Sequence, residues 1–359
     1  MAISINSKYI NIWYYKGNAL AHLEQYQEAI KCYDEAISID NKYGSAWIKK
    51  GNALTHLKQY QKAIQCYNEA ILIKPKYNDA WYGKGLALAH LQYYQESIKC
   101  FDEAISIDNK YGSAWIKKGN ALTHLKQYQE AIQCQNEAIS INPKYIDAWY
   151  GKGLALTHLK QYQESIKCYD EVIYINPRHE IVWCGKGLSL VKLNLYEEAI
   201  KSYDMAISIN SKYINIWYYK GNALSCLKQY QEAIKCYNEA IYINPRHDSA
   251  WYKKGFALAK LNQYQEAIQS YDEAIFINPK SDCSLENKGI ILHKLNKYMD
   301  ALFNFEQALK IRNSAHLFKL KADSLFELRR ISEAKYFYLA AEELGLGQNA
   351  YIKSLLFSL

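Results

Sequence analysis

The chain has 359 residues, enough for two or three ordinary globular domains, and half of its residues are hydrophobic (50%). Its formal net charge of +8 is mild and does not require a nucleic-acid partner. No apolar run is long enough to predict a membrane span, the first residues do not resemble a signal peptide, and nine Cys predict reduced thiols in a cytoplasmic compartment.

An internal repeat dominates the sequence. Residues 1–20 (MAISINSKYINIWYYKGNAL) are identical to residues 205–224, and the offset of 204 is six times 34. A Gly follows each Trp by four residues, a Tyr follows it by thirteen, and each of the five Pro follows a Trp by 28. All eight Trp obey the period of 34: Trp13, Trp47, Trp81, Trp115, Trp149, Trp183, Trp217 and Trp251. This register predicts an array of repeated structural units.

Each unit predicts two helices. The first helix begins near the Trp, a short turn follows near Lys-Gln-Tyr, and the second helix has the form YQEAIKCYDEAISI, with apolar residues at helical spacing. Small residues such as Gly17 predict close contact with aromatic residues such as Tyr33. Because one such hairpin cannot bury its apolar face alone, the units must stack into one elongated all-α domain.

The domain boundaries follow from the register. Residues 205–209 fall past the middle of a second helix, so residues 1–9 are expected to be the end of a truncated preceding helix. About ten repeats are expected over residues 10–348, with Leu285 and Phe318 in the Trp position of the last two. Residues 349–359 could form a C-terminal capping helix, with Tyr351, Leu355 and Leu356 facing inward.

The Trp, Gly, Tyr, Ala and Pro pattern at this period resembles the tetratricopeptide repeat family over about nine tenths of the chain. One departure is Lys three residues after the Trp position in all ten units, from Lys16 to Lys321, where the family often has Leu. The resemblance implies an all-α, right-handed superhelical α-solenoid of about one turn. It also implies a non-catalytic scaffold or adaptor, whose first helices line a concave groove that holds a segment of a partner protein.

A helical wheel places this groove opposite the packed face of the first helix. Residues one and five positions after the Trp are therefore expected to face a partner, and they are mostly Tyr, Ile and Asn. Tyr offers large contact area and Asn can both donate and accept hydrogen bonds, although duplication of ordinary solvated helix residues would give the same pattern. The expected binding residues are Tyr14, Asn18, Ile48, Asn52, Tyr82, Ile116, Asn120, Tyr150, Tyr218, Asn222 and Tyr252.

The His, Cys and Lys residues that repeat with the same period are weaker candidates for a functional site. His22 and its counterparts to His158 repeat every 34 residues, which is too far apart to share one metal ion. The Cys ladder that starts at Cys32 is equally unable to form disulfides, and the Lys ladder falls almost opposite the groove. Because Tyr or Ile stands one residue after the Trp, a Lys- and Asn-based clamp for a terminal carboxylate is not expected.

No cofactor and no metal are expected, and the sequence leaves the partner and the oligomeric state open. One alternative is a repeat fragment of a larger enzyme, such as a glycosyltransferase. Another is a secreted microbial effector that binds host proteins after delivery into a host cell. RNA binding is less favoured, because the groove lacks a stripe of Lys and Arg.

Overall fold

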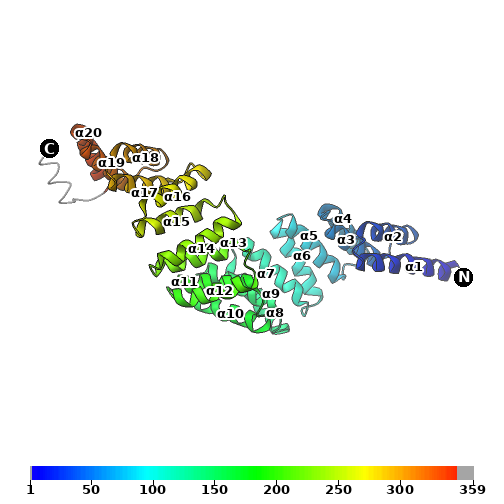
Figure 1. Cartoon of the computed structure of the whole chain (residues 1–359). Coiled ribbons are helices and arrows are strands. Elements are labelled where there is room, and N and C mark those ends of the chain that lie inside the picture. The colour runs from blue at the N-terminus through cyan, green and yellow to red at the C-terminus, as the bar shows by residue number, and fades with distance from the viewer. Residues whose placement is uncertain (1, 346–359) are drawn as a thin grey trace. The chain divides into compact units, whose positions relative to one another are not determined.

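The computed structural model describes residues 2–345, with side chains from residue 9 onward, and these residues form twenty α-helices and no β-strand (Figure 1). The chain divides into two compact units, one up to Ser189 and one from Leu190. The helices up to the division are α1 (Ala2–His22), α2 (Tyr26–Ile39), α3 (Gly44–His56), α4 (Tyr60–Ile73), α5 (Asn78–His90), α6 (Tyr94–Ile107), α7 (Gly112–His124), α8 (Tyr128–Ile141), α9 (Ile146–His158), α10 (Tyr162–Ile175) and α11 (Glu180–Lys192), within which the division falls.

The second unit repeats the same arrangement. Its helices are α12 (Tyr196–Ile209), α13 (Ile214–Cys226), α14 (Tyr230–Ile243), α15 (Asp248–Lys260), α16 (Tyr264–Ile277), α17 (Asp282–Lys294), α18 (Tyr298–Ile311), α19 (Ala315–Glu327) and α20 (Ile331–Glu343). In both units consecutive helices form hairpins, such as α3 with α4, and each second helix also packs on the next first helix, as α4 does on α5. The predicted all-α repeat solenoid is confirmed. Its superhelical hand stays a prediction, and residues 346–359, with the expected capping helix, lie outside the described residues.

From Trp47 to Trp251, the Trp side chain of each unit forms a hydrogen bond with the turn that precedes its helix. Trp47 Nε1 donates to the carbonyl oxygen of Asn41 at 3.0 Å, and Trp81 Nε1 donates to that of Pro75 at 2.9 Å. The same bond, six residues back in the chain, recurs at Trp115, Trp149, Trp183, Trp217 and Trp251. The bond holds the turn against the first turn of the helix, which gives a structural reason for the Trp ladder.

The Gly four residues after each Trp allows the two helices of a hairpin to touch. A Cβ on Gly51 would lie 2.7 Å from a ring carbon of Tyr67, a fully buried second-helix residue. Gly17 and Tyr33 form the same contact, with a corresponding distance of 2.6 Å. The predicted fit of small residues against aromatic rings is confirmed.

The identical segments at 1–20 and 205–224 differ in structure. In the second segment α12 ends at Ile209 and α13 begins at Ile214, and the turn between them is held by Lys212 N donating to Asn210 Oδ1 at 3.2 Å. In the first segment α1 runs without a break from Ala2 to His22, across residues 1–9, which the sequence predicts to be the end of a truncated preceding helix. Helix propagation continues in α1 through the positions that form the turn in the second segment.

Candidate functional site

Two pockets lie on the surface formed by the first helices of the first unit, called here the first-helix surface. One has a volume of about 380 Å³ and lies between α1 and α3; the other, about 370 Å³, lies between α5 and α7. Each has two His, a Tyr, a Lys and at least one Asn in its lining. The first holds His22, Tyr26, Lys49, Asn52 and His56, and the second holds His90, Tyr94, Lys117, Asn120 and His124, 68 residues further on. The site therefore occurs at two places that are two units apart.

The Asn residues that line these pockets already use their carbonyl oxygen. Tyr33 Oη donates to Asn18 Oδ1 at 3.0 Å, and Tyr67 Oη donates to Asn52 Oδ1 at 2.7 Å. Tyr237 and Asn222 form the same bond at 2.9 Å, and Gln135 Nε2 donates to Asn120 Oδ1 at 3.1 Å. The half-buried Asn side chain is thereby fixed by the core, and its Nδ2 group is the part that can donate to a ligand.

The Tyr residues one position after the Trp are half-buried and pack in rows. The ring of Tyr14 contacts that of Tyr43 at 5.2 Å between centroids, and Tyr82 contacts Tyr111 at 5.0 Å. Tyr150, Tyr218 and Tyr252 are also half-buried, so part of each ring reaches the surface. Sequence reasoning placed these side chains on the correct helices, although it did not anticipate how much of each ring the neighbouring unit covers.

Two predicted binding residues lie in the core instead. Ile48 is 8% exposed and Ile116 is 5% exposed, so neither has the exposed side chain that the sequence predicts for a residue in contact with a partner. The ring of Tyr77 packs on the cluster that contains Ile48, and Tyr145 packs on Ile116. A wheel drawn for one helix cannot show this cover, because the covering ring comes from the next unit.

The His ladder forms stacked pairs with Tyr rings. The Tyr26 and His56 rings are 4.6 Å apart and nearly parallel, at 4°. The same stack joins Tyr60 to His90, Tyr94 to His124, and Tyr128 to His158. Within residues 2–345, no three His, Cys, Asp or Glu side chains are placed to hold a metal ion. The stacked His rings thus give the pockets of the first-helix surface part of a flat, polar lining.

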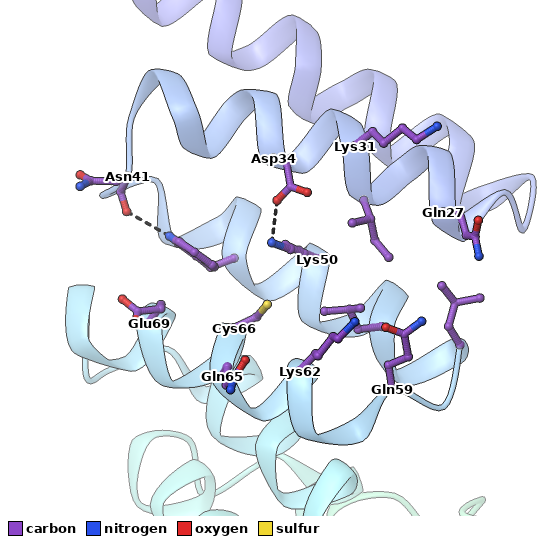
Figure 2. Close-up of a pocket in the computed structure, with 14 residues that line it drawn as sticks. Gln27, Lys31, Asp34, Asn41, Lys50, Gln59, Lys62, Gln65, Cys66 and Glu69 are labelled. Atoms are coloured by element: carbon purple, nitrogen blue, oxygen red, sulfur yellow. Dashed lines mark hydrogen bonds and ion pairs between the residues drawn. The ribbon is translucent and has the colours of Figure 1, made fainter.

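A larger pocket lies on the opposite side, between the second helices α2 and α4 (Figure 2). It has a volume of about 950 Å³, a floor that includes Trp47 and Leu54, and a rim that includes Lys31 and Lys62. An equivalent pocket of about 510 Å³ occurs between α6 and α8, where Glu130 replaces Lys62. The lining charge changes between the two copies, so this pocket has no constant chemistry.

The Lys ladder belongs to the contact between units. Lys50 Nζ lies 2.6 Å from Asp34 Oδ1, as Figure 2 shows, and 5.3 Å from the centroid of the Trp47 ring. Asp is replaced by Asn238 opposite Lys254, and there burial lowers the pKa of the Lys254 ammonium group. The predicted placement of the Lys stems along a neighbouring helix is correct, and the Lys ladder has a structural role.

The ladder thiols, such as Cys66 and Cys100, are buried, and all nine Cys are free. Burial raises the pKa of both thiols to about 11. A thiol held in its protonated form is a poor nucleophile, so these Cys residues serve as core packing. Among the described residues, no helix is long and apolar enough to cross a membrane.

Comparison with family models identifies the repeat. Models described as Tetratricopeptide repeat match residues 10–43, 44–77, 78–111, 146–179, 214–247 and 249–281, and a model described as TPR repeat matches residues 119–160 and 187–225. Together these matches cover most of the chain. Among curated proteins, none matches the sequence at a significant level.

Solved structures share the fold at low identity. A tetratricopeptide repeat protein from Parabacteroides merdae is 16% identical, with a TM-score of 0.51, over 68% of this chain and 97% of its own. YrrB, a TPR protein with an unusual peptide-binding site, is 21% identical, with a TM-score of 0.47, over 52% of this chain and 97% of its own. Yeast Tom70 is 14% identical, with a TM-score of 0.45, over 98% of this chain and 95% of its own.

Proposed function

Because the chain belongs to the tetratricopeptide repeat family, we propose that it is a non-catalytic scaffold that binds a segment of a partner protein on its first-helix surface. The fold and the family support protein interaction in general. The finer proposal, that the partner lies across the pockets of α1, α3, α5 and α7, rests on one observation: the same pocket lining occurs twice, 68 residues apart.

The pocket lining favours a segment rich in hydrogen-bond acceptors. The Nδ2 groups of Asn52 and Asn120 and the ammonium groups of Lys49 and Lys117 are donors, and His56 adds a ring nitrogen. Backbone carbonyls and acidic side chains are the acceptors that a protein segment offers. The half-buried Tyr rings beside the pockets supply apolar contact area at low entropic cost.

The repeat spacing sets the length of the segment. Adjacent packed helices are roughly 10 Å apart, so equivalent pockets two units apart are separated by roughly 20 Å. An extended chain covers about 3.3 Å per residue, and roughly six residues would therefore separate two equivalent contacts. Two weak sites on one segment would act together through their high effective concentration.

Charge reversal in the pockets tests the proposal. Partners captured by the full chain would be purified and their direct binding measured for a Lys49→Glu, Lys117→Glu double variant. The matched control is Lys62→Glu with Lys99→Glu, which makes the same charge change on exposed second-helix residues. Binding should weaken about tenfold or more in the pocket variant and persist in the control. Equal binding by both variants would overturn the placement of the partner.

A further inference from the structure

One face of α1 carries large apolar side chains that lie in solvent. Tyr9, Ile12 and Tyr15 are 56%, 53% and 65% exposed. The residue directly before the Trp position is fully buried in every later unit: Ala46, Ala80, Ala114, Ala148, Val182, Ile216, Ala250, Ser284 and Leu317. Ile12 is the exception to this rule.

The second copy of the same sequence shows what normally covers this face. Residues 205–224 repeat residues 1–20, and there Ile216, the counterpart of Ile12, is 0% exposed. The covering element is α12, which packs on α13. The Tyr203 ring of α12 lies 6.3 Å from the ring of Tyr219, the counterpart of Tyr15.

A charge contact accompanies the apolar contact. Asp204 of α12 forms an ion pair with Lys220, whose counterpart on α1 is Lys16. Lys220 lies over the ring of its own Trp217, and Lys16 lies over Trp13 in the same way, 5.1 Å from the ring centroid. The receiving side of the contact is therefore already arranged on α1.

The covering helices that form this ion pair share a recognisable pattern, whereas α4, α8 and α14 carry Asn in the acidic position. In the first unit, Val182 forms a buried cluster with Tyr169 and Val172 of the preceding second helix, and Asp170 pairs with Lys186. The pattern is an aromatic residue, an acidic residue directly after it, and a small or β-branched residue three positions after the aromatic. In α12 these three positions are Tyr203, Asp204 and Ala206.

We infer that the α1 face, formed by Tyr9, Ile12, Tyr15 and Lys16, docks an amphipathic helix of a partner protein that carries the α12 pattern. The aromatic residue of that helix would pack beside Tyr15, its small residue would cover Ile12, and its carboxylate would pair with Lys16. This contact buries apolar side chains that are now in water and adds a charge pair of fixed position. It is a separate surface from the pockets of the first-helix surface.

A peptide tests the inference directly. A fluorescent peptide with the sequence of residues 195–210, which includes all of α12, would be titrated with the full chain and its anisotropy measured. Saturable binding is expected, and Ile12→Glu should weaken it about tenfold or more, because a charge would replace the centre of the apolar face. Lys99→Glu, at an exposed position of α6 outside both proposed surfaces, is the matched control and should bind the peptide unchanged. Circular dichroism would confirm that both variants keep their helices.

A charge swap distinguishes this contact from nonspecific hydrophobic binding of the peptide. Lys16→Glu should weaken binding of the peptide, and an Asp204→Lys peptide should bind the Lys16→Glu chain better than it binds the parent chain. Absence of peptide binding, or equal binding by Ile12→Glu, would overturn the inference. Sedimentation of the chain alone is the remaining measurement: self-association that Ile12→Glu abolishes would make a second copy of the chain the occupant and would also overturn it.

Discussion

The residue five positions after the Trp contacts the buried aromatic residue of the second helix, so packing in the core constrains its identity. Where this residue is Asn18, Asn52 or Asn222, it accepts a hydrogen bond from the buried Tyr of the second helix. Three other buried Tyr residues face an apolar residue at this position instead: Tyr169 with Leu154, Tyr203 with Leu188, and Tyr271 with Phe256. Where that aromatic is Phe101, the position is Leu86, and where it is Phe305, the position is Ile290. Tyr338 pairs instead with Asp323, at 2.8 Å. The Asn residues proposed to contact a partner are therefore also structural residues.

Two Tyr→Phe substitutions should have different effects on the free energy of unfolding. Tyr67→Phe removes a bond to Asn52 and should lower the free energy of unfolding by about 0.5–1.5 kcal/mol. The Tyr271 hydroxyl is buried and has no hydrogen-bond partner among the described residues, so Tyr271→Phe should be neutral or stabilising. Urea denaturation of both variants provides the measurement. Equal losses would show that the Asn partner has no energetic effect.

The close contact at Gly51 sets a second prediction. In Gly51→Ala the new methyl carbon would lie 2.7 Å from a carbon of the fully buried Tyr67 ring, which is closer than van der Waals contact. Because the ring is buried, it cannot move away freely. Overpacking of this kind costs about 1–3 kcal/mol, which thermal melting would detect. A melting temperature unchanged in Gly51→Ala would contradict the close contact.

Sequence reasoning at this scale identified side chains that partly reach the surface, but not the rings that cover their neighbours. The spacing of Tyr14, Tyr82 and Tyr150 identified side chains that do reach the surface in part. It failed at Ile48 and Ile116, because their exposure depends on rings contributed by the following unit. A projection of one helix contains no information about such tertiary neighbours.

At the scale of the helices, the hairpin turn depends on one backbone conformation. The residue eleven positions after each Trp has a positive φ, for example 58° at Lys58 and 62° at Lys126. It ends the first helix through a bond from the following amide, as Gln59 N donates to Leu54 O at 2.8 Å. Side chains with a Cβ are strained in this region, while Gly and Asn tolerate it better.

Relieving this strain should stabilise the protein. Lys126→Gly should raise the free energy of unfolding by about 0.5–1 kcal/mol, the amount by which the folded-state relief exceeds the added freedom of the unfolded chain. The reverse change at an equivalent turn, Asn262→Lys, should lower it. Chemical denaturation of the two variants measures both effects, and a loss of stability in Lys126→Gly would contradict the assigned strain.

Helix boundaries inside the array were predictable, because the period repeats the same caps and turns. The first helix was not, although its sequence is identical to residues 205–224. The break at Asn210 is made by α12 folding back on α13, a tertiary contact, whereas α1 continues by local helix propagation. Identical residues therefore form different elements when their neighbours differ.

At the scale of the whole molecule, a repeat protein sums small terms over its units. Burial raises the pKa of five ladder thiols from 9.0 to about 11, at Cys66, Cys100, Cys134, Cys168 and Cys236. Each thiol lies in a different second helix, so their contributions should be nearly independent and should add. One buried thiol would change the free energy of unfolding only modestly with pH. Five of them together should make the stability of the whole array depend on pH.

The sign of that dependence follows from proton linkage. In the unfolded chain a thiol loses its proton near pH 9, while in the folded chain these five keep theirs until about pH 11. Unfolding therefore releases protons in this window, and stability is full below pH 9 and falls as the pH rises towards 11. Buried Tyr33 and Tyr67, with pKa values raised to about 12, extend the loss above pH 10.

Replacing the thiols isolates their share of this loss. A variant with Ser at all five positions removes the titrating groups, and Ser202 and Ser270 already occupy equivalent places in the chain. Urea midpoints measured in a reducing buffer between pH 8 and pH 11 should fall for the parent and fall less steeply for the variant. Because the Tyr residues are present in both, their contribution cancels, and the two curves should keep diverging from about pH 9 to the top of the range. Curves that are parallel from pH 8 onward would show that the buried thiols do not control the alkaline stability of the array.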